Sequence, residues 1–170
     1  LLLEAAPGAG KTTIIPLLVA SSPLSSSSNN NNDDDDDTNE TTRINSKVIV
    51  VEPRRVATRS AALRMASLIQ QPVGKSIGYA IRGESRQSSK TQVLVMTDGV
   101  LLNMLRKDPE LSGYDTVILD EFHERGVNCD VALALLREVQ MNYRPDLKII
   151  VMSATLLGNV DRELDDSSDE

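Results

Sequence analysis

Short apolar runs alternate with segments of helical periodicity along most of the chain. The runs are rich in Val, Ile and Leu and are typical of buried strands, and polar or turn residues follow each of them. This alternation predicts an α/β fold with a mostly parallel sheet and helices on both of its faces. The expected strands are 1–3, 47–51, 77–81, 93–96, 116–119 and 147–152, and the expected helices are 12–20, 54–69, 98–105 and 128–140.

Two of the expected helices carry apolar residues that we assign to one face. The stretch between the strands at 77–81 and 93–96 is polar, and we interpret residues 85–90 as a loop. The assigned apolar residues are Val56, Leu63 and Ile69 in the first helix, and Val131, Leu135, Leu136 and Val139 in the second.

One segment interrupts the alternation. Residues 21–46 run through serines, asparagines and then aspartates, with almost no apolar residues. Such a composition cannot offset the conformational entropy lost on ordering, so we expect a disordered surface insertion. The last residues, 161–170, form an acidic tail, and residues 1–160 are expected to form one domain. Because the chain begins with Leu rather than Met, we interpret it as a fragment of a longer protein.

The net charge of −7 is unevenly distributed. Residues 33–46 and 161–170 each carry six acids against one arginine, so the remaining body has a net charge of +3. A mildly basic body is compatible with a nucleic-acid partner. No apolar stretch is long enough to cross a bilayer, so no membrane partner is expected. The single cysteine, Cys129, excludes an internal disulfide framework, is expected to be buried, and favours a reducing intracellular compartment.

A glycine-rich segment lies between the first expected strand and the first expected helix. Residues 5–12 depart from the phosphate-loop pattern G-x-x-x-x-G-K-[ST] only at Ala5. Backbone N–H groups of such a loop face a polyphosphate, Lys11 can reach the β- and γ-phosphates, and the Thr12 hydroxyl can bind Mg²⁺. A glycine-containing turn beside a chance Lys-Thr pair is the alternative. The expected nucleotide-binding residues are Ala6, Pro7, Gly8, Ala9, Gly10, Lys11, Thr12 and Thr13.

Two adjacent carboxylates, Asp120 and Glu121, follow the expected strand at 116–119. Carboxylates at the end of a buried strand are costly unless a cation compensates them, and a Mg²⁺ ion bound with the nucleotide supplies that cation. Asp120 would then hold Mg²⁺ and Glu121 would activate the attacking water. A surface strand–loop junction is the alternative interpretation.

Two other places carry polar residues that suit either a structural role or a ligand contact. Arginines including Arg54 and Arg55 lie at the start of the helix over 54–69, and they indicate either a solvated face or a phosphate-contacting end. Thr97 and Asp98 follow the strand over 93–96, where they can cap the next helix or contact a ligand, and the two roles are compatible.

Taken in order, these segments resemble motifs I, Ia, Ib, II and III of the DEAH-box helicases in superfamily two. The matching residues are 6–12, 52–57, 97–101, 120–125 and 153–155, and residues 78–82 resemble the family's Gly-Tyr…Arg segment. Phe122 and residues 108–113 are most similar to the HrpB type of ATP-dependent RNA helicase within this family.

The resemblance implies a RecA-like P-loop domain that binds ATP and Mg²⁺ through Lys11, Thr12 and Asp120, with Glu121 as the catalytic base. It also implies that His123 couples the nucleotide state to a facing domain, and that Ser153 and Thr155 link hydrolysis to strand separation. Single-stranded RNA is the implied partner, although DNA is not excluded. The implied nucleic-acid contacts are Arg54, Arg55, Arg82, Thr97, Asp98 and Gly99.

The family's second RecA-like domain and its arginine fingers do not occur in this sequence. Such arginines contribute about 10³–10⁵ in rate, so we expect this chain alone to hydrolyse ATP feebly and to unwind nothing. A different P-loop NTPase and a non-catalytic nucleotide-binding fragment are the alternatives. The paired carboxylates favour a hydrolase over a small-molecule kinase, because only the hydrolase must activate water.

Overall fold

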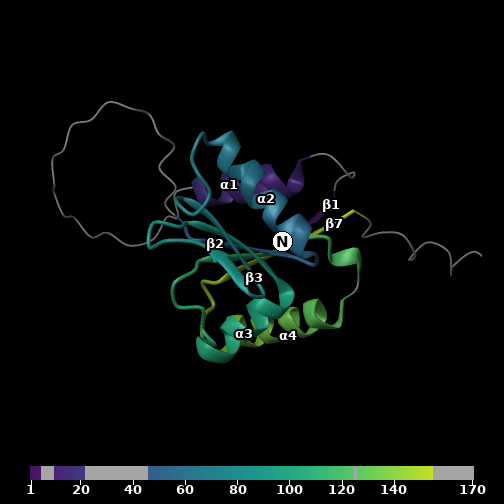
Figure 1. The fold of residues 1–170 in the computed structure, drawn as a ribbon. Coiled ribbons are helices and arrows are strands. Elements are labelled where there is room, and N and C mark those ends of the chain that lie inside the picture. The colour runs from purple at the N-terminus through teal and green to yellow at the C-terminus, as the bar shows by residue number, and fades with distance from the viewer. Residues whose placement is uncertain (5–9, 22–45, 125, 155–170) are drawn as a thin grey trace, which may run out of the picture.

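The computed structural model describes residues 1–4, 10–21, 46–124 and 126–154, which form a sheet between two helical layers (Figure 1). Within this part of the chain the sheet has seven strands in the order β1-β7-β6-β2-β5-β3-β4. Neighbouring strands are parallel, except that β3 and β4 are antiparallel. The strands are β1 (Leu2–Glu4), β2 (Val48–Glu52), β3 (Ile77–Ile81), β4 (Glu84–Arg86), β5 (Val93–Thr97), β6 (Thr116–Leu119) and β7 (Lys148–Ser153).

Helices cover both faces of the sheet, which confirms the predicted fold class. Figure 1 shows α1 and α2 on one face and α3 and α4 on the other. Because side chains alternate across a strand, Val48 and Val50 of β2 pack beneath α1 and α2, whereas Ile49 and Val51 pack beneath α3 and α4. The helices are α1 (Lys11–Ser21), α2 (Arg55–Leu68), α3 (Asp98–Lys107) and α4 (Val127–Asn142), and a 3₁₀ turn, η1, spans Phe122–Glu124.

The predicted apolar faces of the two helices are partly wrong. In α2 the side chains of Val56 and Leu63 are 76% and 49% exposed, and small residues with Met65 face the sheet instead. Small side chains let the α2 backbone approach the sheet closely, so the larger apolar residues turn outward. In α4 the predicted Leu136 and Val139 are buried, together with Cys129 and Ala132, whereas Val131 and Leu135 are 44% and 38% exposed.

The predicted loop over 85–90 includes part of a strand that the sequence analysis missed. Strand β4 pairs with β3 across the two-residue turn Arg82-Gly83, where Gly83 has a φ of +82°. Glycine adopts this conformation without a steric penalty, which permits a tight hairpin. The strand is short, polar and exposed at the edge of the sheet, so it carries no apolar alternation to predict it.

Most of the predicted insertion over 21–46 and the whole tail over 161–170 lie outside the described residues. The two described ends of that insertion belong to the fold: Ser21 is the last residue of α1, and Ser46 is buried and donates its backbone N–H to the Ala20 carbonyl. No helix among the described residues is both long and apolar enough to cross a membrane.

The parallel strands place their carboxyl ends along one edge of the sheet, where ligands of open α/β sheets bind. Glu52, Thr97 and Ser153 end β2, β5 and β7, and Asp120 directly follows β6. All four side chains are buried to 8% exposure or less. The candidate chemistry predicted from the sequence therefore gathers at one edge of the sheet.

Candidate functional site

The glycine-rich segment leads directly into α1 at this edge. Gly10 has a φ of +75°, and a Cβ atom there would lie 3.0 Å from the Ile14 side chain, so both conformation and packing favour glycine. The Gly10 carbonyl accepts hydrogen bonds from the backbone N–H groups of Thr13 and Ile14 and from the Thr13 hydroxyl. Lys11 opens the helix and is 9% exposed. Residues 6–9, also predicted to bind the nucleotide, lie outside the described residues.

Thr12 meets Asp120 at the sheet edge. The Thr12 hydroxyl donates a hydrogen bond of 2.5 Å to Asp120 Oδ2, although 108 positions separate the residues. This contact brings together the two oxygen ligands predicted for Mg²⁺. Among the described residues, no group of three or more His, Cys, Asp or Glu is arranged to hold a metal ion. A Mg²⁺ site does not require such a group, because Mg²⁺ commonly keeps several waters and binds substrate phosphates besides one or two protein ligands.

Glu121 has an unusual backbone conformation. Its φ is +50°, in the left-handed region. This conformation costs residues other than glycine roughly 1–2 kcal/mol. Its backbone N–H donates to Asp120 Oδ1 at 2.8 Å, which ties the two carboxylate residues together. The Glu121 side chain is 37% exposed, so water can reach the predicted catalytic base. Strained residues of this kind concentrate at functional sites.

His123 stands between Glu121 and the end of β7. Its Nδ1 atom accepts a hydrogen bond of 3.4 Å from the Ala154 backbone N–H and lies 3.3 Å from Glu121 Oε2. Ser153, the residue before Ala154, is 1% exposed. The structure therefore brings the predicted base, His123 and the predicted coupling segment into one cluster, while Thr155 lies outside the described residues.

Glu52 is a functional candidate to which the sequence analysis assigned no chemistry. Its side chain is 2% exposed, and among the described residues Oε1 has no hydrogen-bond partner. Burial, followed by the neighbouring Asp120 carboxyl, raises the pKa of Glu52 to about 9. The raised pKa favours the neutral Glu52 carboxyl, which avoids a second negative charge beside Asp120. An acid ending a wholly buried apolar strand is the sequence signal that could have found it.

A cavity of about 510 Å³ opens beside Glu52 between α1 and α2. Thr12 and Thr13 line it from α1, Arg64 lines it from α2, and Glu121 and Glu124 line it from the segment after β6. The cavity thus extends from the phosphate-loop helix toward the arginine-rich helix.

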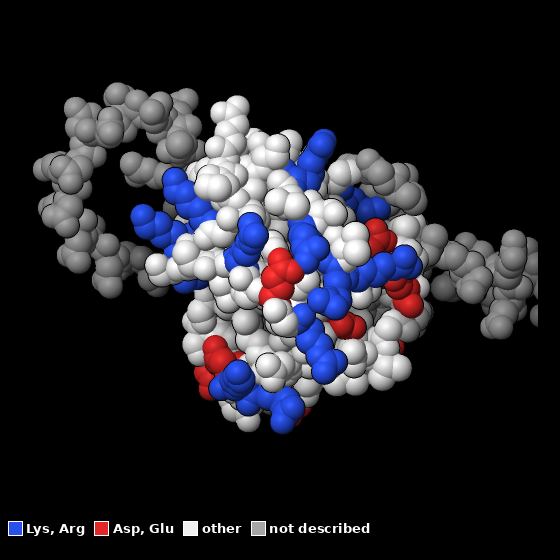
Figure 2. All heavy atoms as spheres, in the orientation of Figure 1, with Lys and Arg blue, Asp and Glu red and all other residues white. Residues whose placement is uncertain are grey.

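The arginines predicted to contact phosphates lie next to one another. Arg54 Nε is 3.1 Å from Glu124 Oε2, and Arg55 Nη2 donates to the Arg82 carbonyl at 3.1 Å. Further along α2, Arg59 pairs with Glu84 and lies over the Tyr79 ring. Figure 2 shows Lys and Arg side chains gathered over α2 and the adjoining strand ends. We call this surface the arginine-rich edge. Its exposed arginines are Arg54, Arg55, Arg59, Arg64 and Arg82.

Thr97 and its neighbours complete this edge. Thr97 is backbone-paired with Glu52 and is 8% exposed, and its hydroxyl makes no capping hydrogen bond to α3. Asp98 is the first residue of α3 and accepts a hydrogen bond from the Gly99 backbone N–H at 2.6 Å. Gly99 is exposed, and a Cβ there would meet no atom within 4 Å. The capping role considered for Thr97 is therefore wrong, and steric crowding does not require glycine at position 99.

At the carboxyl edge of the parallel sheet, α1 begins directly after a phosphate-loop sequence pattern, and Thr12 meets Asp120 beside Glu121. These are the features of a RecA-like P-loop domain. The chain belongs to the DEAD/DEAH box helicase family, whose family model matches residues 1–162.

Individual relatives agree with this assignment. The chain is 44% identical over 155 residues to the ATP-dependent RNA helicase HrpB of Escherichia coli (strain K12), and 39% identical over 156 residues to the ATP-dependent RNA helicase HrpA of Borreliella burgdorferi. These alignments cover 91% and 92% of this chain but 17% of each relative. The crystal structure of the Escherichia coli DEAH/RHA helicase HrpB matches with a TM-score of 0.77 and 44% identity, over 92% of this chain and 18% of that chain.

Proposed function

We propose that this chain is the ATP-binding motor domain of an RNA-dependent ATPase and helicase. The contact between Thr12 and Asp120, beside the partly exposed Glu121, is the observation that supports the proposal most strongly. It joins a phosphate-loop hydroxyl to a carboxylate and leaves a second carboxylate facing water. The names of the relatives, which are ATP-dependent RNA helicases, support the same proposal.

In this proposal the nucleotide binds along the start of α1. Lys11 and the backbone N–H groups of the loop would contact the phosphates, and Thr12 and Asp120 would hold Mg²⁺. Bound Mg²⁺ would neutralise charge on the phosphate oxygens. Glu121 would accept a proton from the attacking water. It is the carboxylate next to Asp120 in the chain, and its side chain remains accessible to solvent. His123 links the base to the end of β7, and with Ser153 and Thr155 it relays the nucleotide state.

Single-stranded RNA is the proposed partner at the arginine-rich edge. Three exposed arginines lie at this edge, Arg54, Arg55 and Arg82, and Arg55 donates to the Arg82 carbonyl. Thr97 pairs with Glu52, two residues before Arg54, and is followed by Asp98 and Gly99 at the start of α3. Contacts of this kind grip phosphates without reading sequence. DNA offers the same phosphates, so the two polymers must be compared directly.

A second RecA-like domain in a longer parent chain is part of the proposal. The chain spans 17% of the length of the curated relatives described above, which leaves room for further domains in those proteins. Arginine fingers from such a domain account for about 10³–10⁵ in phosphoryl-transfer rate. Residues 1–170 alone are therefore expected to turn over ATP feebly and to separate no strands.

The test is ATP turnover by the full-length parent protein with oligouridylate, with oligothymidylate and with neither. The proposal predicts turnover that oligouridylate stimulates strongly and oligothymidylate stimulates less. Equal stimulation by both would make the partner a single strand of either kind. ATP binding with no turnover under any condition would contradict the motor assignment and favour a non-catalytic nucleotide-binding protein.

A further inference from the structure

One ion pair joins the arginine-rich edge to the η1 turn, which directly follows Glu121. Arg54 Nε lies 3.1 Å from Glu124 Oε2, and these residues are 70 positions apart in the chain. The Arg54 side chain is 72% exposed and the Glu124 side chain is 30% exposed. The guanidinium therefore holds a carboxylate at a place where a phosphate can reach it.

Glu124 is also tied to the predicted catalytic base. Its backbone N–H donates to the Glu121 carbonyl at 2.9 Å, which closes the η1 turn. Glu121 is the residue held at a φ of +50°. A change in the position of Glu124 is thus transmitted through a single turn of backbone to a residue in a disfavoured conformation.

We propose that Glu124 is a positioning residue that holds Arg54 and Glu121 in an RNA-free arrangement, and that an RNA phosphate releases it by taking Arg54. This inference rests on the proposed function. Carboxylate and phosphate both bind the same planar guanidinium fork, so one displaces the other. RNA binding at the arginine-rich edge would then free the turn that carries the hydrolytic carboxylate.

The strength of the pair sets the size of the expected effect. An exposed ion pair is worth little, and its loss corresponds to about a 1.5- to 5-fold change in an equilibrium. In the full-length parent, Glu124→Gln removes the charge but keeps the shape. The apparent KM for oligouridylate should fall by this factor, turnover without RNA should rise by up to the same factor, and kcat at saturating RNA should stay unchanged.

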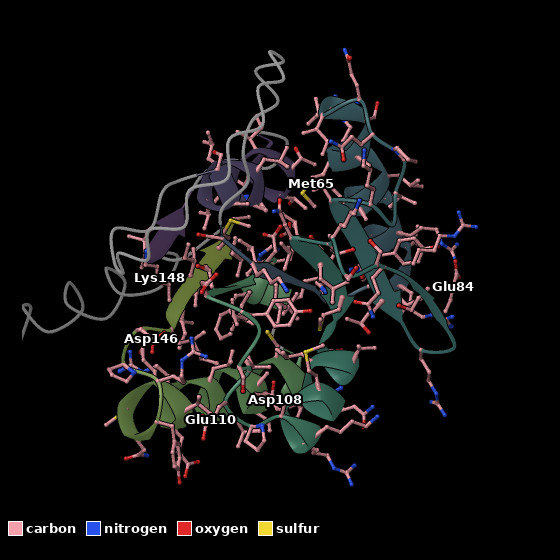
Figure 3. The ribbon with its side chains drawn as sticks, turned by 90° about the vertical axis from the view of Figure 1, so that its left-hand side faces the viewer. Met65, Glu84, Asp108, Glu110, Asp146 and Lys148 are labelled. Carbon is pink, nitrogen blue, oxygen red and sulfur yellow. The ribbon has the colours of Figure 1, made fainter. Side chains whose placement is uncertain are left out.

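A double-mutant comparison separates competition for Arg54 from the loss of a negative charge near RNA. In an Arg54→Ala background, Glu124→Gln should leave the KM for oligouridylate unchanged. Glu110→Gln serves as a charge-matched control, because Glu110 is exposed and lies beside α3 and α4, on the face of the sheet away from α2 (Figure 3). This control should behave as the wild type in every measurement.

The outcomes are distinct. An unchanged KM in Glu124→Gln, or an equal fall in KM with and without Arg54, would overturn the competition. If Glu124→Gln hydrolyses ATP in the absence of RNA at the wild-type rate, the link from Glu124 to Glu121 would be overturned. If RNA does not change the rate of ATP turnover by the wild type, the proposed function would be overturned, and this inference with it. RNA-stimulated wild-type turnover with a KM insensitive to Glu124→Gln would overturn this inference alone.

Discussion

The hydroxyl of Thr12 donates a 2.5 Å hydrogen bond to Asp120, which joins the first turn of α1 to the end of β6. The contact exists because both residues lie at the carboxyl edge of the same parallel sheet, where successive βα connections begin. It holds a hydroxyl and a carboxylate side by side at the edge where the phosphate-loop pattern ends.

The Thr12 hydroxyl is expected to be required for Mg²⁺-dependent turnover. Thr12→Val keeps the side-chain shape but removes the hydroxyl that orients Asp120 and would hold Mg²⁺. Loss of a group that orients a metal ligand typically costs about 10–100-fold in metal affinity or activity, so turnover should fall by about that factor. Thr12→Ser retains the hydroxyl and should stay within a few-fold of the wild type. Turnover of the parent protein, titrated with Mg²⁺ and with EDTA, measures the effect. Equal activities of the Val and Ser variants would contradict the assigned role.

Glu52 should make the stability of the metal-free chain depend on pH. Its pKa is about 9 in the folded protein and 4.5 as a free side chain. Between these values the folded state binds more protons than the unfolded state, so stability falls as pH rises, by at most about 1.4 kcal/mol per unit. Urea unfolding from about pH 5 to about pH 9 measures this slope. Glu52→Gln should flatten the profile, whereas the exposed Glu110→Gln should leave it unchanged.

Gly78 should be required for the β3–β4 hairpin. A Cβ atom at this position would lie 2.7 Å from the Arg86 carbonyl oxygen and 3.0 Å from the Thr91 methyl group. Gly78→Ala must therefore displace the backbone of β4, with a cost of about 1–3 kcal/mol typical of overpacking. Amide hydrogen exchange of residues 84–86 should accelerate. Gly113→Ala is the control, because no atom lies within 4 Å of a Cβ placed there. Equal exchange in both variants would contradict the steric argument.

Cys129 should react slowly with alkylating reagents in the folded protein. The residue is 9% exposed, and burial, with smaller effects from Asp98 and Asp130, raises its pKa to about 11. Since the thiolate is the reactive form, only about one thiol in a thousand is ionised near pH 8. Iodoacetamide labelling should therefore be slow in buffer, rise with pH, and become rapid in urea. Fast labelling of the native chain would show that Cys129 is not held as a buried thiol.

The sequence predicted the centre of the sheet well because β2, β3, β5 and β6 are buried along their whole length. Runs such as 116–119 and 93–96 have no solvated face, so their composition alone marks them as core. Asp120 and Glu121 could be singled out because acids at the end of such a run are costly without a purpose.

Features that depend on neighbouring elements were harder to predict. Val56 and Leu63 are residues of the kind that usually fill a core. The face of α2 that packs on the sheet is instead the one with the alanines, which let the helix approach closely. Glu52 gains its chemistry only from Asp120, which follows a neighbouring strand in the sheet and lies far away in the chain. The pairing of Arg54 with Glu124 likewise depends on how far the segment after β6 turns toward α2.

Glu121 is the residue proposed to activate water for ATP hydrolysis. The most direct measurement is RNA-stimulated turnover of the full-length parent carrying Glu121→Gln, with ATP affinity measured on the same preparation. If Glu121 is the general base, turnover should fall by about 10²–10⁴, typical of removing such a group, and ATP binding should be retained. Turnover within a few-fold of the wild type, at unchanged ATP affinity, would show that Glu121 is not the base and that another group activates the water.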